Sequence, residues 1–351
     1  MRARKSIEVA YQAFKKHQAL HPLTHYTGIL SLHGLARLAL NSGDERLVEE
    51  CHGCLLPFVR GEHEKSRFQA NFGNYYCGGN GTALLFWQGK LPEAQETLRD
   101  YAEDLMLRAP RDAEGIFCHP RYPGEGRIWI DAAFAVTPFL LFAGLAFGEE
   151  RYVEEAFRQS AMMYAALRDA ENGLLHQSRG FAGPGRFSED HWSRGNGWGM
   201  LALSELVSDI PAGDRRRPAA ERMFVDLVSA CLRYQDQDGL WHQEITDPLS
   251  YVETSGSGLI LYAVGVGLAK GLLPEAARAK LLLGLQGYLA YIKDGSVFHT
   301  CPGCLSPGRG TILDYEARGP VLNDPHAFGP VTLAFGQAFR LGIEEVSEND
   351  D

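Results

Sequence analysis

The chain has 351 residues, of which 45% are apolar and 22% are charged, a balance typical of a globular protein with a substantial core. Its 44 acidic and 34 basic residues give a formal net charge of −10, which argues against general affinity for nucleic acid because such binding needs cationic patches. The one dense basic cluster, Arg215 to Arg217, is flanked by proline and glycine and is expected to be a solvated loop.

The first predicted element is an amphipathic helix over residues 6–21. A positively charged start precedes it, but Glu8, Lys15 and Lys16 interrupt any apolar run, so we expect no export signal. Seven cysteines, an odd number, fit reduced thiols. We therefore expect a cytoplasmic protein.

Two long uncharged stretches, residues 132–148 and 254–269, are predicted to be buried helices. Both are shorter than the roughly 20 apolar residues that a membrane-spanning helix needs. We therefore expect no membrane partner.

A turn pattern recurs four times between helical segments such as 151–168 and 218–234. Each copy has an acidic or amide residue, a glycine that tolerates positive φ, a short apolar run and a histidine. The copies cover residues 114–119, 172–176, 238–242 and 294–299. A spacing of about 60 residues holds two helices and two connections, and six such units fill the chain.

The spacing of these turns predicts an all-α fold, an (α/α)6 toroid of six helical hairpins with buried inner helices. We expect one domain over residues 1–343, followed by a disordered acidic tail over 344–351. The four histidines would then lie at one rim, around a central cleft. Taken singly, each histidine could equally cap a helix or pack under a loop.

Asp131 lies in an otherwise apolar segment, residues 128–134. Burying a bare charge is costly, so its carboxyl group must be solvated in a cleft, paired or protonated. It could cap the helix predicted at 132–148. Facing an apolar cleft, it would instead have the raised pKa of a general acid. The residues alone leave both interpretations open.

Segment 191–198 places Arg194 between two indoles, Trp192 and Trp198. Indole faces bind sugar rings and a guanidinium binds a carboxylate bidentately, which favours a site for an acidic sugar. The alternative is a glycine-rich loop whose tryptophans fill the core. A helix predicted at 199–207 would also leave backbone N–H groups near Gly197 free to attract an anion.

The run Trp-Ser-Arg-Gly-Asn-Gly-Trp at 192–198 resembles the hallmark of glycoside hydrolase family 105, the unsaturated rhamnogalacturonyl hydrolases. Family 88, the unsaturated glucuronyl hydrolases, is related. Further blocks occur in the expected order at 129–131, 239–243, 251–255 and 324–329. The resemblance covers about residues 110 to 340.

The resemblance implies hydrolysis of oligosaccharides that carry a Δ4,5-unsaturated uronic acid at the non-reducing end. Asp131 would protonate C4, water would add at C5, and the resulting hemiketal would open. The partner is an acidic oligosaccharide, and neither a cofactor nor a metal is expected. The resemblance and the motif together give nine expected substrate-binding residues: Tyr26, Asn74, Asn80, His119, Trp129, His176, Trp192, Arg194 and Trp198.

One departure from the family pattern lies at residues 71–81, where the family usually has another active-site Asp. This stretch contains no acid. Asn74 and Asn80 are expected to bind sugar hydroxyls, but an amide cannot act as a base. The aglycone, the source polysaccharide and the oligomeric state are left open.

Three alternatives stay open. The pairs Cys51/Cys54 and Cys301/Cys304 have zinc-ligand spacing, and zinc near Glu253 would indicate a cysteine-zinc glycosidase. A sugar epimerase or isomerase could use the rim histidines as acid and base. The third alternative is a glycan-binding toroid without catalysis.

Overall fold

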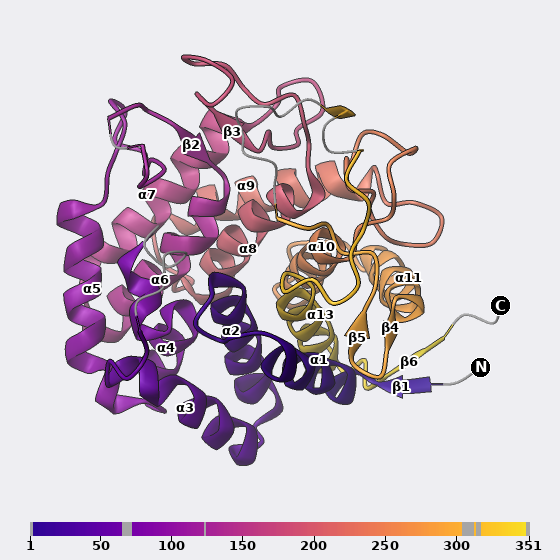
Figure 1. Ribbon diagram of the computed structural model, residues 1–351, viewed down its shortest axis with the longest axis horizontal. Coiled ribbons are helices and arrows are strands. Elements are labelled where there is room, and N and C mark those ends of the chain that lie inside the picture. Colours follow the sequence, from indigo (N-terminus) through magenta and orange to yellow (C-terminus); the bar gives the residue numbers. More distant parts are fainter. Residues whose placement is uncertain (1–2, 65–71, 123, 304–311, 314–316, 349–351) are drawn as a thin grey trace.

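The computed structural model describes residues 3–64, 72–122, 124–303, 312–313 and 317–348. Helices on the inside and outside of a ring alternate along the chain (Figure 1). The inner helices are α2 (Tyr26–Ser42), α4 (Gly79–Trp87), α6 (Asp131–Phe147), α8 (Ser193–Asp209), α10 (Thr254–Ala269) and α13 (Phe328–Arg340). The outer helices are α1 (Ser6–Leu20), α3 (Glu45–Val59), α5 (Gln95–Arg108), α7 (Glu150–Leu167), α9 (Arg217–Leu232) and α11 (Ala277–Ala290).

Each inner helix packs against the next one, and α13 closes the ring on α2. The inner helices α6, α8 and α10 are buried almost all round, as expected for helices covered by neighbours on every side. The predicted all-α toroid of six hairpins is thus confirmed.

Three pairs of short antiparallel strands accompany the helices. They are β1 (Ala3–Lys5) with β6 (Glu345–Ser347), β2 (Ile128–Trp129) with β3 (Ser178–Arg179), and β4 (Ile292–Lys293) with β5 (Ser296–Val297). Two 3₁₀ turns, η2 (Gly73–Cys77) and η3 (Pro92–Ala94), flank α4. The β1–β6 pair joins the two ends of the chain (Figure 1), so the first part of the predicted tail is ordered and the expectation of disorder there is wrong.

The long connections that lead from outer to inner helices all lie at one end of the ring, which we call the rim. Its four predicted turns have glycines with positive φ, at Gly115, Gly173, Gly239 and Gly295 (74° to 86°). The rim connections bind the starts of the inner helices. Ile130 N donates to Gln177 O (2.9 Å), Ser193 N to Gln243 O (2.9 Å) and Thr254 N to His299 O (3.1 Å).

The cluster Arg215 to Arg217 corrects one prediction. Arg216 is only 4% exposed and pairs with Asp214, Glu150 and Glu154, because it begins α9 against the acidic end of α7. It is therefore a buried ion-pair centre, not a solvated loop.

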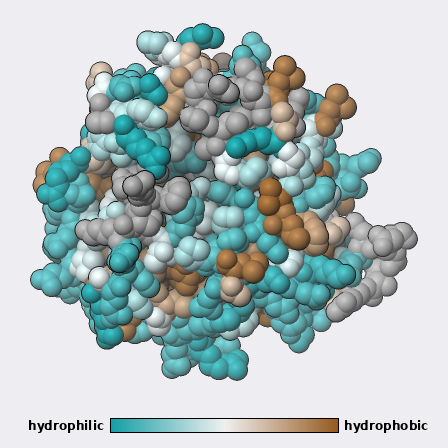
Figure 2. Space-filling model, viewed as in Figure 1, coloured by the Kyte–Doolittle hydropathy of each residue, from teal (hydrophilic) through white to brown (hydrophobic). Residues whose placement is uncertain are grey.

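The exposed surface is consistent with the substantial apolar core expected from the composition. The face shown in Figure 2 is mainly hydrophilic, with hydrophobic side chains in small separate groups. Among the helices described, none combines the length and the apolar character that crossing a bilayer demands.

Candidate active site

A cavity of about 140 Å³ opens at the rim end of the ring, where α2 and α6 begin. Its walls are Tyr26, Phe72, Tyr75, His119, Trp129, Asp131, Phe134, Ala135 and Trp198. The structure therefore brings together five of the residues predicted from the sequence: Tyr26, His119, Trp129, Asp131 and Trp198.

Aromatic rings form most of the cavity wall. Phe134 stacks on Trp198 with ring centroids 4.7 Å apart and planes at 21°, and Phe72 stacks on Trp129 at 5.9 Å. His119 lies 4.2 Å from the Trp129 ring, and burial together with nearby arginines lowers its pKa to about 4. Such flat apolar faces suit the faces of a sugar ring.

Asp131 is the first residue of α6 and follows the N-cap residue Ile130, so it does not occupy the capping position. Its Oδ2 is buried and has no hydrogen-bond partner in the described part of the chain. Burial raises the pKa of the carboxyl group to about 6, although the charge of Arg194, a backbone N–H and the Trp198 side chain oppose the shift. Of the two interpretations of Asp131, the structure fits the acid in an apolar cleft and not the helix cap.

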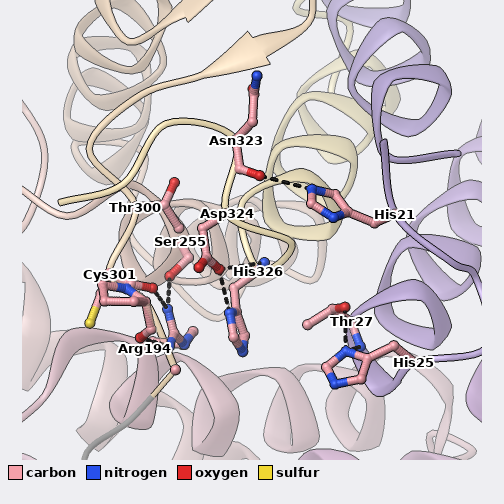
Figure 3. A network of polar contacts seen from close by, with 12 residues as sticks. His21, His25, Thr27, Arg194, Ser255, Thr300, Cys301, Asn323, Asp324 and His326 are labelled. Atoms are coloured by element: carbon pink, nitrogen blue, oxygen red, sulfur yellow. Dashed lines mark hydrogen bonds and ion pairs between the residues drawn. The ribbon is translucent and has the colours of Figure 1, made fainter. Parts of the chain in front are cut away.

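Arg194 lies behind the cavity wall and is fully buried. Its guanidinium donates to Ser255 Oγ (2.9 Å) and to the backbone oxygens of Cys301 (2.6 Å) and Pro302 (2.8 Å), as part of the network in Figure 3. It also lies 4.4 Å from the Trp192 ring, which is itself buried. Arg194 and Trp192 are thus close to the site but do not line the cavity.

Glu253 binds the two segments that carry the hydrogen-bond acceptors of Arg194. Its carboxylate caps α10 by accepting from Ser255 N (2.9 Å) and Gly256 N (2.6 Å), and it also accepts from Cys301 N (3.0 Å). It lies 4.0 Å from Arg194 Nη1. Glu253 is a fully buried residue that joins these segments by hydrogen bonds, and it lies outside the cavity wall.

The motif at 192–198 is the start of a helix, since α8 begins at Ser193. The predicted anion site near Gly197 is therefore wrong, because its N–H lies inside the helix. Glycine is needed there for close packing: a Cβ at Gly197 would lie 2.7 Å from Leu259, and one at Gly199 would lie 2.5 Å from Leu175.

Asn74 and Asn80 are fully buried and do not line the cavity. Asn80 Nδ2 donates to Phe134 O (3.0 Å), and Asn74 Nδ2 donates to Ala135 O (2.9 Å). The Phe134 carbonyl lacks its usual helical donor because Pro138, four residues later, has no N–H. These asparagines thus support α6 beneath the cavity, and the expectation that they bind substrate hydroxyls finds no support in their positions.

His176 lies away from the cavity wall, stacked on Phe187 with ring centroids 5.0 Å apart. With Asp169 and His191 it forms the one group of metal-ligand type found among the described residues. His191 is already placed between carboxylates, with Asp169 Oδ2 at 2.9 Å and Glu244 Oε1 at 3.6 Å. This arrangement is that of a charge-paired histidine.

The three cysteines of the two pairs that the structure describes join no group of metal-ligand type among the described residues. Cys51 and Cys54 lie in α3, and Cys301 lies in the connection between α11 and α13. Cys304 lies outside the described residues.

Two kinds of site residue were not predicted from the sequence. Phe134 lies one helical turn after Asp131, so helical spacing alone could have placed it in the cavity. His326 binds the Tyr26 hydroxyl from behind the wall, and only its place in the block 324–329 singled it out.

The comparisons with known proteins agree with this geometry. The family model described as Glycosyl Hydrolase Family 88 matches residues 2–341. The unsaturated rhamnogalacturonyl hydrolase YesR of Bacillus subtilis (strain 168) is 30% identical over 173 residues, which cover 48% of this chain and 50% of that protein. An unsaturated 3S-rhamnoglycuronyl hydrolase of Formosa agariphila is 32% identical over 155 residues, 41% of each chain. The matches thus span about half or less of these relatives.

Solved structures share the fold across almost the whole chain. A family 105 glycoside hydrolase of C. acetobutylicum superposes with a TM-score of 0.81 at 23% identity, covering 95% of this chain and 99% of that one. An unsaturated glucuronyl hydrolase of Bacillus sp. GL1 gives a TM-score of 0.70 at 16% identity, covering 97% of both chains. Since the family model spans nearly all of the sequence, the chain belongs to Glycosyl Hydrolase Family 88.

Proposed function

We propose that the protein removes a Δ4,5-unsaturated uronic acid from the non-reducing end of lyase-generated oligosaccharides by hydrating the C4=C5 double bond. The observation that carries this proposal is Asp131, a carboxyl group in an aromatic cavity whose Oδ2 has no hydrogen-bond partner among the described residues and whose pKa is raised to about 6. A group of that acidity holds its proton in mildly acidic solution and can still release it, as a general acid must.

In the proposed reaction Asp131 donates its proton to C4 of the enol ether. Positive charge develops at C5 and on the ring oxygen, and water adds at C5. The hemiketal then opens at the bond between C5 and the ring oxygen, which leaves a ketone at C5 and a hemiacetal at C1. Collapse of that hemiacetal to an aldehyde breaks the bond from C1 to the aglycone and releases the remaining sugar. The aromatic walls formed by Trp129, Phe134 and Trp198 hold the ring and exclude bulk water, so the proton transfer takes place in a medium of low polarity.

Arg194 contributes to this reaction by its charge. Its hydrogen bonds to Ser255, Cys301 and Pro302 fix the guanidinium in place behind the wall, and its field already lowers the pKa of Asp131. The same positive potential would favour a uronate carboxylate in the cavity. Direct bidentate contact between Arg194 and the substrate stays a prediction.

The names of the relatives support a proposal for the substrate class. The names of two of them specify unsaturated rhamnogalacturonyl and 3S-rhamnoglycuronyl substrates. We therefore propose an acidic oligosaccharide from a lyase-treated plant or algal polysaccharide as the partner of this chain.

The test is an absorbance assay on lyase-generated oligosaccharides, in which the band of the conjugated unsaturated uronate disappears on hydration. We expect the wild type to remove the band and Asp131→Asn to lose about 10²- to 10⁴-fold in kcat. The matched control is Asp190→Asn, a second buried carboxyl group with a raised pKa that lies outside the cavity wall. Wild-type rates are expected for this control.

Two outcomes would overturn the proposal. One is a band that persists with pectin, ulvan, arabinogalactan and glycosaminoglycan fragments alike. The other is an Asp131→Asn variant as active as the wild type. Mass spectrometry of the products separates hydrolysis from isomerisation, because an epimerase or isomerase leaves the substrate mass unchanged.

A further inference from the structure

A chain of hydrogen bonds leads from a buried carboxylate to the wall of the cavity. Asp324 Oδ1 lies 2.5 Å from His326 Nδ1 and also accepts from His326 N (3.0 Å), as Figure 3 shows. His326 Nε2 in turn binds the hydroxyl of Tyr26, which lines the cavity together with Asp131. His326 is only 5% exposed, so this chain is shielded from solvent.

The order of the partners fixes the direction of each hydrogen bond. A carboxylate only accepts, so Nδ1 of a neutral His326 carries the ring proton and donates it to Asp324. Nε2 is then an acceptor, and the Tyr26 hydroxyl must donate to it. A tyrosine oxygen whose proton is directed away from the cavity offers its lone-pair side as an acceptor.

The charges around His326 favour this neutral form. Burial is the largest effect and Arg194 the next, and they lower the pKa of His326 to about 4 even though Asp324 raises it. Burial alone would raise the pKa of Asp324, but His326 and Arg194 hold it below its usual value. The titratable and charged groups that face His326 are Arg194, Asp324, His25, His17 and Tyr26.

We infer that Tyr26, oriented by His326 and Asp324, accepts the proton of the attacking water and so supplies the second proton-transfer group that residues 72–81 lack. This inference rests on the proposed function. Asn74 and Asn80 cannot take that role, because they bind the α6 backbone below the cavity. In this arrangement Tyr26 touches the reacting water, while His326 and Asp324 are positioning residues.

The proton balance of the step closes without any further reagent. Asp131 gives its proton to C4, and the π electrons of C4=C5 form the new C–H bond. As the water oxygen bonds to C5, one water proton passes to the Tyr26 oxygen while the Tyr26 proton passes to His326 Nε2. His326 then returns its proton through Tyr26 to water in the cavity, and Asp131 takes up a proton from the same water.

A weak base suffices for this step. Water that adds to a ring carbon with oxocarbenium character becomes strongly acidic, so an imidazole with a pKa of about 4 can accept its proton through Tyr26. The nearby Asp324 carboxylate stabilises the imidazolium that forms.

The experiment compares Tyr26→Phe and Asp324→Asn with the wild type in the absorbance assay, over pH 3 to 8. We expect Tyr26→Phe to lower kcat about 100-fold, the lower end of the range for a lost proton-transfer group. Asp324→Asn is expected to lower kcat on the order of tenfold, because the useful His326 tautomer is no longer fixed. The control is Tyr11→Phe on α1, which removes a hydroxyl that binds Glu50 (2.8 Å) far from the cavity and is expected to leave kcat unchanged.

The pH profile separates proton transfer from a merely structural role. In the wild type kcat/KM should fall below about pH 4 as His326 becomes protonated, and above about pH 6 as Asp131 loses its proton. In Asp324→Asn the acidic limb should move to lower pH, because the lost carboxylate was raising the pKa of His326. The double variant should be no slower than Tyr26→Phe alone, since both act in one chain.

Each outcome decides between the two proposals. Wild-type kcat in Tyr26→Phe, with Asp131→Asn inactive, overturns the inference and leaves the proposed function intact. Additive losses with an unmoved acidic limb also overturn it. If the wild type acts on no unsaturated substrate, the proposed function fails and the inference fails with it.

Discussion

Two carboxyl groups of the ring, Glu205 and Asp131, have opposite properties, although Glu205 is fully buried and Asp131 has its Oδ2 buried. Glu205 lies in the middle of α8, where it accepts from Tyr262 Oη (2.7 Å) and His33 Nε2 (3.1 Å) and pairs with Arg37. Burial would raise the pKa of Glu205, but Arg37 and His33 hold it well below its usual value. Asp131 has no such partner, and burial raises its pKa to about 6.

The difference teaches that the partners of an acid decide whether burial raises its pKa. The two acids also lie in different parts of the ring. Glu205 lies 12 residues after the start of α8, about 18 Å along the axis from the rim end. There ion pairs and hydrogen bonds join α2, α8 and α10. At the rim end, Asp131 Oδ2 has no hydrogen-bond partner among the described residues and lies at the cavity.

The largest expected effect comes from breaking the paired end. We expect Glu205→Gln to lower the free energy of unfolding by about 3–5 kcal/mol at pH 7, because it leaves Arg37 buried with Asp209 as its remaining acidic partner. Urea unfolding followed by circular dichroism measures the change. The control is Glu103→Gln, which breaks an ion pair with Arg151 on the outer surface and should cost at most about 1 kcal/mol. Equal losses in the two variants would contradict the comparison.

Asp131→Asn should raise the free energy of unfolding, which is the opposite of the effect expected for Glu205→Gln. The folded pKa of about 6 lies above the ordinary value of 3.8, so ionisation of Asp131 opposes folding. Its cost develops as the pH rises from about 4 to 6 and is complete above that. The variant is therefore expected to gain roughly 1–3 kcal/mol of stability at pH 7 and almost nothing at pH 4. Thermal unfolding at both values of pH measures the gain, and a variant less stable than the wild type at pH 7 would refute the account of Asp131.

Glu205 should show the reverse dependence on pH in the same experiment. Its folded pKa is lowered, so its contribution to stability is present above its ordinary value and is lost as the pH falls. The deficit of Glu205→Gln should accordingly shrink in acid.

A smaller effect is expected from the neutral hydrogen bonds below Asp131. Asn80→Ala leaves the Phe134 carbonyl without a donor and should cost about 1–3 kcal/mol. Asn74→Ala is the matched control, since the Ala135 carbonyl also has a helical donor in Phe139, and it should cost less. Chemical denaturation of both variants gives the difference, and identical losses would rule out the role assigned to Pro138.

Much of the architecture was predictable from the sequence. Uncharged residues 254–269 coincide with α10, and the recurring Gly-His turns located the rim, because both signals are local. The glycines of 192–198 misled the prediction, since they serve helix packing and not a turn. The expected cytoplasmic location stays a prediction.

The candidate site was only partly predictable for the same reason. Sequence patterns singled out Asp131, Trp129 and Trp198 by their types and order, and the cavity contains all three. Arg194 was singled out as well, but long-range contacts with Ser255 and Cys301 decided that its Nη1 already donates within the protein.

The sequence by itself determined the helical hairpins, their turns and the acid at the head of α6, because periodicity and turn chemistry depend on neighbours along the chain. Only the tertiary structure decided which buried acid is paired and which is not. Glu205 meets Arg37 across 168 residues of sequence, and Tyr26 meets His326 across 300. Such pairings depend on the closure of the ring, which brings α13 against α2, and closure is a property of the whole chain.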